Sequence, residues 1–151
     1  MKKRKNSIGK VQKGRYIIDV TIGQLYFRDN SMQLAKIGGL SWTRARCIAA
    51  DKHWLYITDN GYLYKVHPQT GDYLEIGNYK ARIQRPIWFD RKWLYTLLRT
   101  NSAVDNNDLF AEVWRLKPDK PEYTECVAKR VRLDMPSIAD SLDKEIYLDI
   151  S

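Results

Sequence analysis

The feature that most constrains this fold is a pattern of short strands within residues 54–77, which read WLYITDNGYLYKVHPQTGDYLEIG. Aromatic and β-branched residues fill three runs, at 54–58, 62–66 and 73–76. The first two runs flank Asn60-Gly61 and the last two flank Thr70-Gly71. An Asn-Gly pair between such runs favours a tight hairpin, because both central turn positions need positive φ. The pattern predicts three antiparallel strands.

The same pattern recurs on both sides of this unit. Residues 16–18 match residues 54–56 at an offset of 38, and residues 93–95 match them at an offset of 39. In the downstream copy, a polar loop at about 100–108 replaces the tight turn, and a strand at 110–116 follows. A last partial copy runs from 137 to 148. Repetition at a fixed period indicates a repeat architecture.

A further apolar strand ending in aspartate precedes each of the last three copies. These strands are CIAAD, PIWFD and PSIAD, which end at Asp51, Asp90 and Asp140. We predict a structural role for these carboxylates, because aspartate readily accepts backbone hydrogen bonds in turns. Each complete unit then holds four short antiparallel strands in about 40–50 residues, the period of a β-propeller blade. One such sheet cannot cover both its faces, so neighbouring units must stack on it.

Residues 37–77 resemble the tectonin/tachylectin-like β-propeller repeat. The similar elements are Ile-Gly followed by Trp42, a strand of small residues, Leu-Tyr, Gly-x-Leu-Tyr-x-Val-x-Pro and Thr-Gly. The match is good over this unit and weaker over the others. The resemblance implies a binding module, often for glycans or other surface ligands, and not a catalyst.

The number of units predicts an incomplete ring. We expect a basic N-terminal arm at 1–8 and a single all-β domain at 9–151, with about three and a half propeller-like repeats. Closed propellers usually have at least four blades, so the chain would leave sheet edges and one flank open. We therefore predict a homo-oligomer that completes the ring. The alternatives are a curved partial propeller, a β-sandwich or a barrel.

The links between units are basic, in a chain that has 26 Lys and Arg against 18 Asp and Glu and a net charge of +8. In a propeller such links lie on one face, so their cations would converge there. Arginine grips phosphate or carboxylate bidentately, and aromatic rings stack on bases or sugars. The alternative is solvated loops, or pairing of Arg46 and Arg85 with the repeated aspartates. The predicted ligand-binding residues are Trp42, Arg44, Arg46, Tyr79, Lys80, Arg82, Arg85, Lys129, Arg130 and Arg132.

Signals for catalysis, metals and cofactors are weak. His53 and His67 are the two imidazoles, and neither has a metal-binding spacing. The chain has no Gly-rich phosphate loop and no G-x-S-x-G motif. Cys47 and Cys126 are too few for a disulfide framework and lie far apart, so we expect free thiols in a reducing, cytoplasmic setting. No apolar run approaches the roughly 20 residues that cross a bilayer.

These observations favour a non-enzymatic binding module without cofactor or metal. Its basic surface would face a polyanion, either a nucleic acid or the acidic face of another protein. A lectin-like glycan binder is the alternative that the family resemblance implies. A structural, self-assembling scaffold subunit is the third interpretation, and it would account for an incomplete ring without any ligand.

Overall fold

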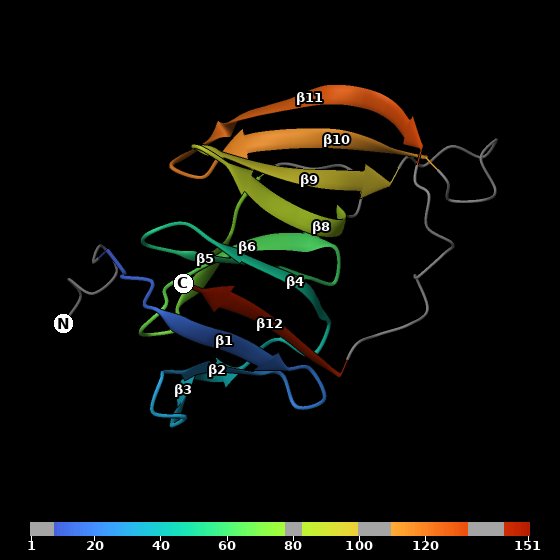
Figure 1. Ribbon diagram of the computed structural model, residues 1–151. Coiled ribbons are helices and arrows are strands. Elements are labelled where there is room, and N and C mark those ends of the chain that lie inside the picture. Colours follow the sequence, from blue (N-terminus) through green and yellow to red (C-terminus); the bar gives the residue numbers. More distant parts are fainter. Residues whose placement is uncertain (1–7, 78–82, 100–109, 133–143) are drawn as a thin grey trace.

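The computed structural model describes residues 8–77, 83–99, 110–132 and 144–151. Within these ranges the chain is all-β and forms three antiparallel sheets of four strands each (Figure 1). In spatial order, the first sheet contains β12 (Glu145–Ile150), β1 (Gly14–Asp19), β2 (Gln24–Arg28) and β3 (Leu34–Leu40). The middle sheet contains β4 (Ala45–Ala50), β5 (Leu55–Asp59), β6 (Tyr62–Val66) and β7 (Tyr73–Glu75). The third sheet contains β8 (Ile83–Asp90), β9 (Trp93–Arg99), β10 (Phe110–Lys117) and β11 (Lys120–Arg132).

The last strand of the chain returns to the first sheet. β12 pairs antiparallel with β1, with Tyr16 opposite Leu148 and Ile18 opposite Ile146. The sequence pattern had placed these residues in a fourth, partial unit, whereas the structure makes β12 the innermost strand of the first sheet. The pairing is favourable because it removes the open backbone edge that β1 would otherwise present. The first sheet thereby has the same number of strands as the other two.

The three sheets stack face to face, with the middle sheet between the other two (Figure 1). Their innermost strands are neighbours, because β4 contacts both β12 and β8. Side chains alternate between the two faces of a strand. On β5, Leu55 and Ile57 therefore enter the core shared with the first sheet, while Tyr56 enters the core shared with the third. All three residues are fully buried.

Two glycine-dependent features hold the strands in this arrangement. Asn60 and Gly61 have φ of 54° and 85° between β5 and β6, which confirms the predicted hairpin turn. Where the first and middle sheets meet at their outer strands, Gly71 packs on Gly38. A Cβ on Gly71 would lie 2.6 Å from the Cα of Gly38, so only glycine permits this close approach of the two backbones.

Candidate functional site

Some of the predicted ligand-binding residues are beyond what the structure describes. Tyr79, Lys80 and Arg82 lie outside the described residues. Arg85 lies in β8, while Arg130 and Arg132 lie in β11, and for these three only the backbone is described. Of the predicted N-terminal arm, residues 1–7 also lie outside the described ranges.

Trp42 belongs to the core. Its side chain is 2% exposed, and its ring meets those of Tyr64 and Tyr73 edge-on, with centroids 5.6 Å and 5.0 Å away. Its backbone N–H donates to the Gly23 carbonyl at 3.1 Å, which ties the link before β4 to the first sheet. An aromatic ring enclosed in this way has no face left for a ligand, so Trp42 packs in the core and does not stack on a ligand in this structure.

The remaining predicted cations lie where the chain enters β4 and along β11. Arg44 is exposed, and its backbone N–H donates to the Asp59 carboxylate at 3.1 Å. Arg46 is half-buried, and Lys129 is exposed on β11. Arg46 lies near the start of β4 and Asp51 follows its end. At about 3.3 Å per residue their Cα atoms are roughly 16 Å apart, and the pairing of Arg46 and Arg85 with the repeated aspartates stays a prediction.

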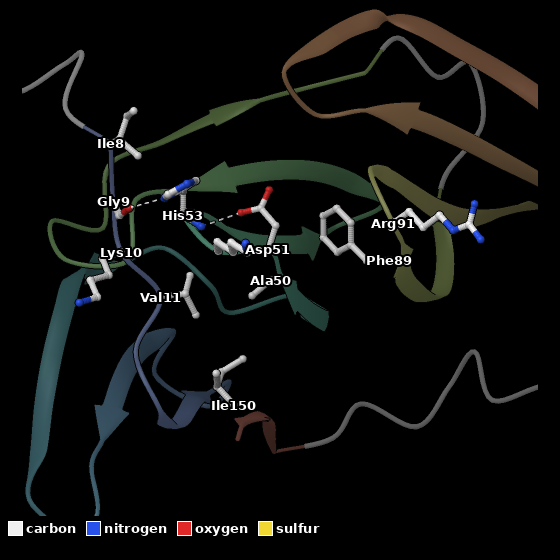
Figure 2. A pocket seen from close by; sticks show the side chains of 11 residues that line it. Ile8, Gly9, Lys10, Val11, Ala50, Asp51, His53, Phe89, Arg91 and Ile150 are labelled. Carbon is white, nitrogen blue, oxygen red and sulfur yellow. Dashed lines mark hydrogen bonds between the residues drawn. The ribbon is translucent and has the colours of Figure 1, made fainter.

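The opposite end of the inner strands borders a cavity of about 790 Å³ that is open to solvent (Figure 2). The ends of β4, β8 and β12 meet there, together with the chain segment that precedes β1 and the turn that follows β4. Its walls combine apolar side chains with basic ones. The lining residues are Ile8, Gly9, Lys10, Val11, Ala50, Asp51, Lys52, His53, Phe89, Arg91 and Ile150.

Hydrogen bonds hold the N-terminal wall of this cavity in place. The Val11 N–H donates to the Lys52 carbonyl at 3.0 Å, and the backbone of Lys10 exchanges two hydrogen bonds with the Gln69 amide. His53 Nδ1 lies 3.1 Å from the Gly9 carbonyl (Figure 2). Because a carbonyl can only accept, Nδ1 carries the proton, which leaves Nε2 for other partners.

Asp51 is occupied by structural hydrogen bonds. Its Oδ1 accepts from the backbone N–H groups of His53 and Trp54 at 2.9 Å and 2.8 Å, and its Oδ2 accepts from the Tyr56 hydroxyl at 2.9 Å. Burial raises the pKa of Tyr56, and the negative charge of Asp51 raises it further. These contacts confirm the predicted structural role of aspartate at this position. They also leave Lys10, Lys52 and Arg91 as the charged side chains at the cavity that are not committed to the turn's hydrogen bonds.

Sequence reasoning missed this cavity. Lys52 and Arg91 are exposed and each directly follows one of the repeated aspartates, in Asp51-Lys52 and Asp90-Arg91. That shared register was a usable signal for two cations at one end of the sheets. The apolar walls had no such signal, because Val11 and Ile150 come from segments nearly a whole chain apart.

Comparison with known proteins adds no assignment. No protein-family model matches the chain, and no curated protein matches its sequence. In the described part of the chain, no group of three or more His, Cys, Asp and Glu side chains is placed to hold a metal ion. The same residues contain no helix long and apolar enough to cross a membrane.

Proposed function

We propose that this chain is a non-enzymatic binding module that takes an anionic ligand, an acidic segment of another protein, at the cavity where the inner strands end. The observation that carries this proposal is the combination of apolar walls and basic side chains at one opening. Lys10, Lys52 and Arg91 are exposed at the opening, while Val11, Phe89 and Ile150 are half-buried around it.

The apolar walls favour a protein segment over a uniformly charged polymer. An apolar side chain of the ligand would gain about 25 cal/mol per Å² of surface buried against Val11, Phe89 and Ile150. Flanking carboxylates would meet Lys52 and Arg91, where hydrogen bonds assisted by charge are stronger than neutral ones. The net charge of +8 would speed the encounter with any acidic partner.

The proposal is tested with a fluorescent peptide in which glutamates flank a leucine, titrated by anisotropy at several salt concentrations. The double variant Lys52→Glu/Arg91→Glu should bind at least about tenfold more weakly, since each contact to a charged group contributes about 1.5–3 kcal/mol. The matched control is Arg44→Glu/Lys129→Glu, which changes the net charge equally at sites away from the cavity lining. The control should retain most of the affinity.

Equal weakening in the two double variants would show that binding follows net charge alone, and would contradict the cavity as the site. A peptide in which alanine replaces the leucine tests the apolar walls, and it should bind more weakly to the unmodified chain. Single-stranded DNA of the same charge provides the comparison for nucleic acid. If DNA binds more tightly than the peptide at equal salt, with the steeper salt dependence of counterion release, the ligand is a nucleic acid and the protein-segment proposal fails.

A further inference from the structure

Equivalent positions in the three sheets have different surroundings on the face that points towards the next sheet. In the first sheet, Tyr16 and Ile18 are buried against the middle sheet. The matching Tyr56 of the middle sheet is buried against the third. In the third sheet the matching residues are Trp93 and Tyr95, which lie on its outer face and are only half-buried.

The opposite face shows the complementary difference. Leu55 of the middle sheet and Leu94 of the third are fully buried against the preceding sheet. Their counterpart in the first sheet is Ile17, which is 8% exposed but belongs to neither of the two cores between sheets, because it lies on the outer face of the first sheet. Across the strands beside it lie Tyr26, which is half-buried, and Tyr147, which is 54% exposed. At these positions, each outer face therefore has apolar or aromatic residues whose counterparts are buried between sheets elsewhere in this chain.

Both outer faces hold aromatic rings beneath an arginine whose charge is already paired. On the first sheet, Arg15 lies 4.1 Å from the centroid of the Tyr147 ring and binds Asp149 through two hydrogen bonds, of 2.6 Å and 3.0 Å. On the third sheet, Arg115 lies 4.0 Å from the centroid of the Trp93 ring and binds Glu125. Covering a paired ion costs less than covering an unpaired one, so the pairing lowers the cost of burying these two arginines.

We propose that the outer face of the third sheet of one copy packs on the outer face of the first sheet of a second copy, and that two copies close a ring. The occupant is a second copy because each face repeats the pattern that this chain already matches with its own sheets. The number of copies follows from the number of sheets. With three sheets in the described part of each chain, two copies give six, within the four to eight blades typical of propellers, whereas three copies would give nine.

The contact at this interface can be specified from the existing one. Between the middle and third sheets, the ring of Tyr56 meets that of Phe89, with centroids 5.1 Å apart. The position of Tyr56 corresponds to Tyr95. The position of Phe89, beside Leu94, corresponds to Tyr147, beside Ile17. The rings of Tyr95 and Trp88 are stacked, with centroids 5.5 Å apart. Tyr95 of one copy should therefore pack against Tyr147 of the second copy.

The test is the solution mass of the full chain, measured by light scattering at micromolar concentration. The unmodified chain should have twice the monomer mass of 17.8 kDa. Trp88→Arg and Tyr147→Glu should each give a monomer, although the two residues lie on different sheets. An equimolar mixture of these variants should form dimers again, because one interface is then unmodified and the other places an arginine near a glutamate. Leu74→Arg, at a 59% exposed position on β7, is the matched control and should stay dimeric.

Circular dichroism of each variant checks that it is folded, and recovery of dimers in the mixture requires that both variants are. An unmodified chain that is monomeric under these conditions overturns the proposal. Dissociation by only one of the two variants also overturns the proposal, because it would mean that one face pairs with the same face of the second copy and that the other face is not part of the interface. Equal dissociation by Leu74→Arg would also overturn it.

Discussion

The middle sheet and the first sheet each have four antiparallel strands but different surroundings. The middle sheet has a sheet on each side, and Leu55, Tyr56 and Ile57 of its β5 strand are all fully buried. Among the described residues the first sheet has one neighbouring sheet, and Tyr147 on its other face is 54% exposed. A shared strand pattern therefore specifies a sheet, while the burial of each side chain depends on which neighbour is present.

The largest expected effect sharpens that comparison in the core. Leu55→Ala should lower the free energy of unfolding by about 2–5 kcal/mol, because a fully buried leucine leaves a cavity between two sheets. Ile17→Ala, at the matching position of the first sheet, should cost less in dilute protein, since Ile17 is 8% exposed and, unlike Leu55, is not part of a core between two sheets. Urea denaturation measures both.

A concentration series adds a second comparison. If two copies associate, the cost of Ile17→Ala should rise towards that of Leu55→Ala as protein concentration increases, because association stabilises the folded state by mass action. Equal losses for the two variants in dilute protein would contradict the difference between the sheets.

A smaller effect is expected where the first and middle sheets meet. Gly71 has φ of 78° and touches the Gly38 backbone, whereas a Cβ on Gly39 would meet no atom within 4 Å. Gly71→Ala should lose about 1–2 kcal/mol from the left-handed backbone alone, and more from the clash with Gly38. Gly39→Ala is the neighbouring control, and its stability should change little. Thermal unfolding of the two variants compares them directly, and equal midpoints would show that the sheets do not depend on this approach.

Local features of the fold could be predicted from the sequence, and long-range ones could not. The Asn60-Gly61 turn and the hydrogen bonds of Asp51 depend on residues within a few positions of each other, so the pattern sufficed. The pairing of β12 with β1 joins residues such as Arg15 and Asp149, 134 positions apart. A strand pattern in the sequence does not specify which of several distant strands will pair with it.

The same limit applied to the candidate site. The sequence predicts that Trp42 contacts a ligand, because arginines lie beside it in the chain. In the structure its ring instead contacts Tyr64 and Tyr73, which come from later strands. The cavity depends on the ends of three inner strands and on the segment before β1. The residues that line the cavity are therefore brought together by the spatial order of the strands, which the repeat pattern alone does not predict.

The smallest expected effect compares two carboxylates of the middle and first sheets. Burial raises the pKa of Asp59 at the end of β5, although the Arg44 N–H and charge oppose this shift. The hydrogen bonds from Arg15, and its charge, lower the pKa of Asp149 on β12. A raised pKa contributes stability that is complete below the unfolded-state value, about 3.9, and is lost as the pH rises through the folded-state pKa. A lowered pKa contributes stability that is present above the unfolded-state value and is lost as the pH falls through the folded-state pKa.

Replacing each carboxylate by its amide should therefore have opposite consequences at pH 7. Asp59→Asn should slightly raise the urea midpoint, because the amide oxygen still accepts from Arg44 and no buried charge remains. Asp149→Asn should slightly lower it, with a loss that salt reduces because the ion pair is exposed. Each difference should shrink as the pH falls below the pKa of the carboxylate that was replaced. A midpoint shift of the same sign for both variants at pH 7 would contradict the assignment of burial as the dominant influence on Asp59.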